Sequence, residues 1–326
     1  MAATGEIQKV AIVGTGVIGA SWAALFLARG LDVVATDPAP NAEANLRRFI
    51  DAAWKDLSTL GLAPRASRDR LAFTADMKQA VSSAQFVQEN GPERADLKVK
   101  LFADMDAATR PDTLIASSSS GLTATVMQSS CAHPERVVVG HPFNPPHMIP
   151  LVEVVGGAKT SPEAIPRAMA FYRAIGKRPI HLRREVVGHV ANRLQAALYR
   201  EVAYLIGEGV LDVADADDAV SWGPGLRWGV MGPNMLFHLG GGQGGIGQFM
   251  EHFAGPMSMW MKDLGTLTEF SPQLKQMIID GVLKEAGGHS IDALAQDRDA
   301  MLLELLATRS KDRNAVVQAE AAGPVG

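Results

Sequence analysis

The glycine-rich segment at residues 14–19 constrains the fold more than any other part of the chain. It reads Gly-Thr-Gly-Val-Ile-Gly and lies between a short apolar run, Lys9–Val13, and an apolar helical pattern. A strand that leads through closely spaced glycines into a helix lets the backbone approach a pyrophosphate, and the free N–H groups of the helix bind it. We therefore expect cofactor contacts from five residues of this turn: Gly14, Gly16, Val17, Ile18 and Gly19.

Asp37 indicates which dinucleotide the turn accepts. It follows a second β-branched run, Asp32–Thr36. An acidic residue at this position binds the hydroxyls of the adenosine ribose and repels a 2′-phosphate, so the sequence predicts NAD rather than NADP. The alternative is that Asp37 is a turn residue before Pro38.

Short apolar runs alternate with helical patterns up to about residue 186, and this alternation favours a doubly wound, mostly parallel sheet of the α/β class. The residues from 187 onward show helical patterns broken by glycine and proline. We expect a Rossmann-type dinucleotide-binding domain at 1–186 and an all-helical domain at 187–326 for substrate binding and dimerisation. An amphipathic stretch at 41–66 predicts a helical insertion, and the small, polar residues from about Ser310 are expected to fray. The strands that we expect are Lys9–Val13, Asp32–Thr36, Gln85–Gln88, Thr113–Ala116, Val137–Val139 and the run LVEVV that begins at Leu151.

Composition excludes several classes of protein. The 326 residues carry a net charge of −4 with both signs mixed, which gives no footprint for nucleic acid or an anionic membrane. No run of about 18 apolar residues suggests a membrane span, and the N-terminus does not resemble a secretion signal. The single cysteine, Cys131, suits a cytoplasmic location and lacks the surroundings of a catalytic thiol. We expect no metal site.

Residues 137–156, VVVGHPFNPPHMIPLVEVVG, carry the strongest indication of chemistry. Here His141 ends one apolar run and Glu153 lies inside the next. A carboxylate in such a run is costly unless a partner meets it, and His141 is the obvious partner. A histidine–carboxylate pair can take a proton from an alcohol near neutral pH. A structural ion pair between two strands is the alternative.

Two further polar positions are candidates for ligand contacts. Ser117–Ser120 follow a predicted strand, which places their hydroxyls at the ligand-binding edge of the sheet, although, taken alone, a polar turn that caps a helix is the better explanation. Asn192 begins the long helical stretch after residue 188. Asparagine is a poor helix former, so it either contacts substrate or satisfies a backbone group there.

Together, these motifs resemble the 3-hydroxyacyl-CoA dehydrogenase superfamily over most of the chain. The resemblance is carried by the glycine turn, the serine cluster, the HPFNP segment with VEVV after it, and the ANR segment. It implies that His141 and Glu153 perform the acid–base step and that Ser120 and Asn192 contact the substrate. The segment ENGPERADLKVK is also similar to the family, and it implies that Glu93 and Lys98 lie at the cofactor and substrate edge.

One departure bears on the substrate. The glycine- and lysine-rich segment of the form GRKxGxGFY, usual near the end of the acyl-CoA enzymes, is absent from the sequence. The second half is instead similar to the branch that contains lambda-crystallin (an L-gulonate 3-dehydrogenase) and L-carnitine dehydrogenase. This implies NAD-dependent oxidation of a small free L-3-hydroxy acid. A 3-hydroxybutyryl-CoA dehydrogenase and an NAD-binding structural protein remain the alternatives.

The groups of such a substrate suggest weaker candidates. A carboxylate would be bound by Arg227 or Lys98, although a surface salt bridge is the alternative for each. A quaternary ammonium would need aromatic faces, which Phe143, Trp222 and Trp228 could supply if they are not core residues. The methionines of the second half favour a subunit interface, and with the resemblance they imply a homodimer.

Overall fold

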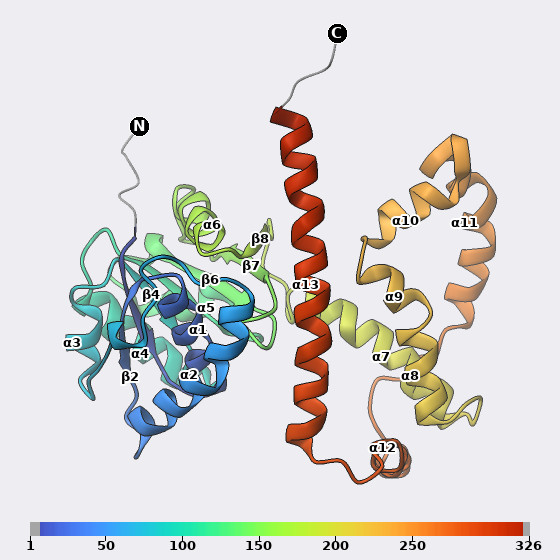
Figure 1. Ribbon diagram of the computed structural model, residues 1–326, viewed down its shortest axis with the longest axis horizontal. Coiled ribbons are helices and arrows are strands. Elements are labelled where there is room, and N and C mark those ends of the chain that lie inside the picture. Colours follow the sequence, from blue (N-terminus) through green and yellow to red (C-terminus); the bar gives the residue numbers. More distant parts are fainter. Residues whose placement is uncertain (1–6, 322–326) are drawn as a thin grey trace. The chain divides into compact units, whose positions relative to one another are not determined.

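The computed structural model describes residues 7–321, and it describes side chains up to residue 309. The chain divides after Arg193 into two compact units (Figure 1), unit 1 up to Arg193 and unit 2 from Leu194. Among the described residues, unit 1 holds every strand, and unit 2 is helical.

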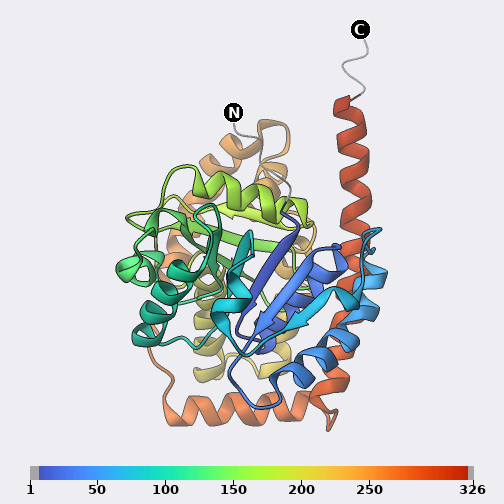
Figure 2. The ribbon, with the colours of Figure 1, turned by 90° about the vertical axis from the view of Figure 1, so that its left-hand side faces the viewer.

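Unit 1 is built on one sheet with the strand order β3-β2-β1-β4-β5-β6-β7-β8. The first six strands run parallel, β7 runs antiparallel to β6, and β8 runs parallel to β7. In Figure 2 the view is turned by 90° from that of Figure 1, so that unit 1 faces the viewer. The strands are β1 (Lys9–Val13), β2 (Asp32–Thr36), β3 (Leu71–Phe73), β4 (Phe86–Glu89), β5 (Leu114–Ser117), β6 (Val137–Pro142), β7 (Leu151–Gly156) and β8 (Arg178–His181). The predicted strands are confirmed, whereas the short β3 and β8 were not predicted.

Successive residues of a buried strand point in opposite directions, so both faces of this sheet must be covered. Helices cover each face. In β1, Val10 and Ile12 pack with α1, α2 and α6, while Ala11 and Val13 pack with α3, α4 and α5. These helices are α1 (Val17–Ala28), α2 (Ala42–Thr59), α3 (Met77–Val81), α4 (Ala95–Ala108), α5 (Ala124–Met127) and α6 (Ala164–Ala174). The predicted doubly wound, mostly parallel sheet is therefore confirmed.

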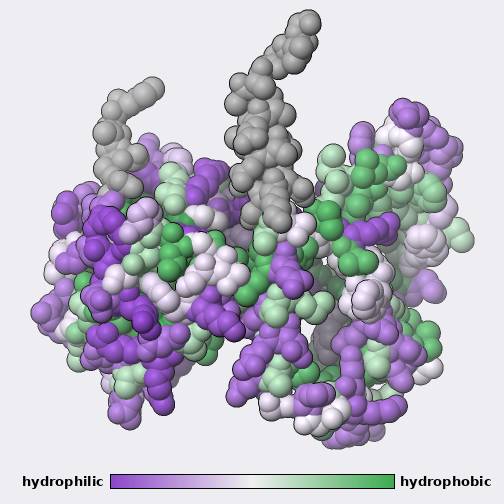
Figure 3. Space-filling view, viewed as in Figure 1, coloured by the Kyte–Doolittle hydropathy of each residue, from purple (hydrophilic) through white to green (hydrophobic). Residues whose placement is uncertain are grey.

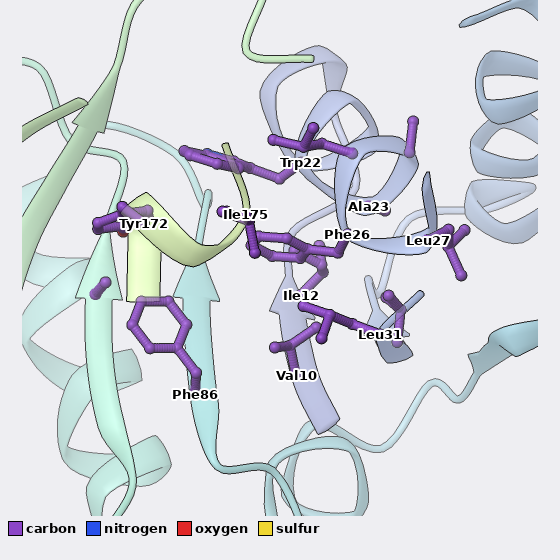
Figure 4. Packing of buried hydrophobic residues seen from close by; sticks show 14 of the residues in the cluster. Val10, Ile12, Trp22, Ala23, Phe26, Leu27, Leu31, Phe86, Tyr172 and Ile175 are labelled. Carbon is purple, nitrogen blue, oxygen red and sulfur yellow. The ribbon is translucent and has the colours of Figure 1, made fainter. Parts of the chain in front are cut away.

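Aromatic side chains fill the first of these two layers (Figure 4). The rings of Trp22 and Phe26 on α1 stack at 5.4 Å. Phe86 of β4 stacks on Phe171 of α6 at 4.1 Å. The helix predicted at 41–66 is α2, whose buried stripe of Leu46, Ile50, Ala53 and Leu57 packs into the same cluster.

Unit 2 consists of helices whose small core is formed by α7, α8 and α12, with Ile206, Val213 and Ala216 buried. Gly281 allows α12 to approach α8 closely, because an added Cβ would lie 2.2 Å from Val213. Its helices are α7 (Ala191–Gly207, which starts in unit 1), α8 (Val213–Ser221), α9 (Pro224–Trp228), α10 (Pro233–Gly240), α11 (Gly245–Asp263), α12 (Pro272–Glu285) and α13 (Ile291–Ala321).

The C-terminal stretch differs from the expectation. Helix α13 continues to Ala321 where the sequence predicted fraying from about Ser310, and the remaining residues, 322–326, lie outside the described part of the chain.

Candidate functional site

The glycine turn between β1 and α1 has the geometry that phosphate binding requires. Gly14 has a φ of +86°, and a Cβ on Gly19 would lie 1.9 Å from the Gly14 carbonyl oxygen, so both positions need glycine. A Cβ on Gly16 would meet nothing within 4 Å, and no side chain caps the start of α1 there. Val17 is exposed, while Ile18 packs partly against the core. The first N–H groups of α1 are therefore open to a phosphate.

Asp37 joins the end of β2 to this turn. Its Oδ2 accepts hydrogen bonds from Thr15 N at 2.7 Å and Thr15 Oγ1 at 3.1 Å. Its Oδ1 accepts from Ala39 N at 2.8 Å, so the turn role considered as an alternative is also present. A carboxylate has about four acceptor sites, which leaves capacity for a ribose hydroxyl. The half-buried Asp37 thus fits the position of the ribose ligand.

A buried ion pair that the sequence reasoning did not identify joins the carboxyl end of β4 to α4. Lys98 Nζ on α4 lies 2.8 and 2.9 Å from the two carboxylate oxygens of Glu89, and both side chains are almost fully buried. Ser117 Oγ and the Gly91 amide also donate to Glu89, each at 2.6 Å. Lys98 is therefore a buried counter-ion in this structure, which argues against its predicted direct contact with a substrate carboxylate. A charge at the end of the run QFVQE was the signal that could have revealed Glu89.

Glu93 organises the serine loop after β5. Its Oε1 accepts hydrogen bonds from Ser119 Oγ at 2.5 Å and from the Gly121 amide at 2.7 Å, and Lys98 Nζ lies 3.8 Å from its other oxygen. Partial burial raises the pKa of this carboxyl, but the hydrogen bonds and Lys98 outweigh burial and lower it overall. Ser120 is exposed and makes no side-chain hydrogen bond to the described residues, so its hydroxyl is available to a ligand.

His141 and Glu153 face each other across the β6–β7 ladder, where the register pairs them directly. His141 Nδ1 lies 2.9 Å from Glu153 Oε2, and the pair is buried. Residues directly opposite in an antiparallel pair point to the same face, so the fold itself brings these side chains together. His141 Nε2 makes no hydrogen bond within the described part of the chain.

The other oxygen of Glu153 binds the start of α7. Glu153 Oε1 accepts hydrogen bonds from the amides of Val190 and Ala191 at 2.8 and 2.9 Å. Burial raises the pKa of Glu153, but the bonds from His141 and from these amides outweigh burial, and its pKa is lowered overall. Glu153 is therefore ionised at neutral pH, where it accepts the Nδ1–H of His141 and leaves the Nε2 lone pair of that ring free to take a proton.

The remaining candidates are distributed over both units. Half-buried Asn192 follows directly after the amide that binds Glu153, and Phe143 lies half-buried in the loop after β6. Lys177 holds this loop by donating to the carbonyls of Pro146 and Ile149. Unit 2 carries the exposed Arg227 and Trp228 on α9 and the exposed Trp222 before it. Their roles stay predictions.

The described residues give little support to a catalytic thiol, a metal site or a membrane-spanning helix. Burial raises the pKa of Cys131 to about 12, so its thiolate is not populated at neutral pH. Within residues 7–309, whose side chains are described, no three His, Cys, Asp or Glu side chains gather as a metal site would require. No helix within residues 7–321 is long and apolar enough to cross a membrane.

Comparison with known proteins agrees with this geometry. Residues 9–186 match the NAD-binding domain of 3-hydroxyacyl-CoA dehydrogenase, and residues 188–285 match its C-terminal domain. The chain is 50% identical over 302 residues to an L-carnitine dehydrogenase of Streptomyces griseus, covering 92% of this chain and 90% of that protein. It is 47% identical to an L-carnitine dehydrogenase of Pseudomonas putida, covering 92% of this chain and 94% of that protein.

A solved structure gives the same result for the fold. The structure of 5-formyl-3-hydroxy-2-methylpyridine 4-carboxylic acid 5-dehydrogenase, described as an NAD⁺-dependent dismutase, superimposes with a TM-score of 0.82 at 32% identity. It covers 93% of this chain and 99% of its own. Similarity of this extent carries the cofactor and the class of reaction, so the chain is an NAD-dependent dehydrogenase that acts on a hydroxyl group. The chain belongs to the 3-hydroxyacyl-CoA dehydrogenase family.

Proposed function

We propose that this dehydrogenase oxidises the 3-hydroxyl of a small free L-3-hydroxy acid to the 3-oxo acid, and that the acid is L-carnitine. The buried His141–Glu153 pair, beside the NAD-binding edge of the sheet, is the observation that carries the reaction. The relatives named L-carnitine dehydrogenase, 42–50% identical over most of the chain, support the substrate.

The proton and the hydride leave the substrate by separate routes. His141 Nε2 accepts the hydroxyl proton, while Glu153 holds the ring through Nδ1–H and stabilises the imidazolium that forms. Bound NAD supplies the acceptor for the hydride of the same carbon. In the reverse direction the imidazolium returns its proton to the carbonyl oxygen.

Ser120 and Asn192 orient the substrate in this proposal. The free hydroxyl of Ser120 and the amide of Asn192 would hydrogen-bond the reacting oxygen or the nearby carboxylate, which fixes the carbon for hydride transfer. Arg227 is the candidate for binding the carboxylate, and the aromatic side chains of Phe143, Trp222 and Trp228 are candidates for the quaternary ammonium.

A 3-hydroxyacyl-CoA thioester is the second candidate substrate, because the matching family carries that name. L-Gulonate is a third, from the same branch of the family. All three require the same proton and hydride transfers, so only a direct comparison of substrates separates them.

The substrate is tested by following NADH at 340 nm with L-carnitine, L-gulonate, L-3-hydroxybutyrate and L-3-hydroxybutyryl-CoA, each with NAD and with NADP. We expect turnover with L-carnitine and NAD. With NADP we expect a lower kcat/KM, since the carboxylate of Asp37 would repel the 2′-phosphate. Preference for the thioester or gulonate would contradict the proposed substrate. Binding of NAD without turnover of any of the four would favour a structural, crystallin-like role.

We also propose a cytoplasmic homodimer that forms through unit 2. The support is a set of large apolar side chains on the surface of unit 2, part of which is visible in Figure 3. They include Met235, Leu239, Phe253, Met259, Trp260, Ile279 and Leu283. Surfaces of this kind are usually buried in an interface. A monomeric mass in solution would contradict the dimer.

A further inference from the structure

His189 occupies an unusual backbone position beside the His141–Glu153 pair. Its φ is +50°, in the left-handed region that non-glycine residues rarely adopt, and it follows Gly188 with a φ of +74°. Its side chain is nevertheless buried, with 3% exposed. Strained positions of this kind persist where the surrounding structure holds them, and they concentrate at functional sites.

The hydrogen bonding of the ring defines its tautomer. His189 Nε2 lies 3.0 Å from the carbonyl oxygen of Ser119. A carbonyl can only accept, so Nε2 carries the hydrogen and Nδ1 presents a lone pair. Nδ1 is the one buried side-chain nitrogen or oxygen without a hydrogen-bond partner in the described part of the chain. Such a group is rare in a folded protein and calls for an explanation.

His189 is linked to both residues of the His141–Glu153 pair. The ring centroids of His189 and His141 are 4.8 Å apart, with an angle of 38° between the planes. The two residues that follow His189, Val190 and Ala191, donate their amides to Glu153. The side chain therefore packs on the histidine, and the adjacent backbone holds the carboxylate.

The surroundings keep this ring neutral. Burial has the largest effect and lowers the pKa of His189. The hydrogen bond to the Ser119 carbonyl raises it, a positive charge on His141 lowers it, and Glu153 and Glu93 raise it, with the balance lowered. A charged ring at this distance would oppose the proton that His141 gains during oxidation. A neutral ring avoids that repulsion and keeps water from one face of His141.

We propose that His189 is a positioning residue for the proposed base. Its neutral ring, anchored on the Ser119 carbonyl, holds the imidazole of His141 in place while that imidazole gains the substrate proton. The inference rests on the proposed function, because it requires His141 to be the base.

Two substitutions separate the effect of the His189 ring from the effect of its left-handed backbone. Asparagine tolerates a left-handed φ, so His189→Asn removes the ring with little added strain. His189→Phe keeps an aromatic face but loses both nitrogens. The matched control is His181→Asn, the same change at an exposed histidine of β8.

For His189→Asn we expect kcat to fall about 10- to 100-fold, the scale of a small displacement of a catalytic group. The affinity for NAD should stay unchanged. The midpoint of the acidic limb of kcat/KM should move to higher pH, because water that reaches His141 favours its protonated form. His189→Phe should leave that midpoint in place, and His181→Asn should match the unsubstituted protein in both measurements.

Unchanged kcat and pH profile in His189→Asn would overturn the proposal. A loss of kcat that only follows a lowered melting temperature, with the pH midpoint unmoved, would also overturn it, since a structural role alone predicts that. The parallel variant His141→Ala distinguishes failure of the proposed base from failure of the positioning role. If it keeps full turnover, the base assignment fails; if it is inactive while the His189 variants behave normally, only the positioning role fails.

Discussion

Turnover of the His141→Ala variant is expected to fall by about 10²–10⁴-fold, while NAD binds with nearly unchanged affinity. The alcohol proton then has no acceptor at the reacting oxygen, whereas the glycine turn and Asp37 follow β1 and β2, away from β6, and keep their geometry. Steady-state kinetics at saturating NAD measure the loss, and a fluorescence titration measures NAD binding. His133→Ala, at an exposed histidine of unit 1, is the matched control.

A second variant of the same pair tests how Glu153 acts. In Glu153→Gln the amide oxygen can still accept from Val190 and Ala191, but its NH₂ group then faces His141 Nδ1. That contact favours the tautomer with the hydrogen on Nε2, which cannot take the substrate proton. We expect a loss of similar size, and a double variant little worse than either single one, because the two residues act as a unit. Full turnover in His141→Ala would exclude His141 as the base.

The Lys98→Met variant is expected to lose about 3–5 kcal/mol of the free energy of unfolding. Methionine keeps much of the side-chain volume but leaves Glu89 buried without its counter-ion. Ser117 Oγ and the Gly91 amide remain as its only donors among the described residues. Urea unfolding measures the effect, and Lys100→Met, an exposed lysine on the same helix, is the matched control.

The double variant Lys98→Met with Glu89→Gln tests whether the unpaired charge of Glu89 causes the loss of stability. It removes the buried charge together with its partner, so much of the lost stability should return. If Lys98 instead bound the substrate directly, Lys98→Met would raise the KM for substrate and leave the unfolding free energy unchanged. That result would contradict the structural role assigned to the ion pair.

The fold could be predicted largely from local signals. The glycine turn after a buried strand, and the repeated alternation of strands with helices, specify a parallel sheet with two covered faces. The short strands β3 and β8 escaped prediction because RLAF and RPIH have too few alternating residues to stand out. Their place is set by pairing with β2 and β7, which the local sequence does not encode.

The site could be predicted where a residue is evidently unfavourable in its own segment, as a buried charge is. Glu153 stands out as a charge in an apolar strand, and its contact with His141 is present in the structure. Lys98 was linked to the cofactor and substrate edge, but its partner Glu89 depends on how α4 packs on β4, and sequence spacing does not give that packing. His189 gave no signal, since its importance arises from a left-handed turn and a distant carbonyl.

The direct pairing of His141 with Glu153 across the β6–β7 ladder has a consequence for how such a chain can diversify. The two groups that we propose move the proton are joined by the backbone of the sheet, so they separate only if the sheet itself opens. Two of the candidate groups for recognising the substrate, Ser120 and Phe143, lie in loops, which tolerate change far better than strands. Evolution or protein engineering can therefore exchange one hydroxy acid for another at the loops while the chemistry, built into the sheet, is inherited unchanged.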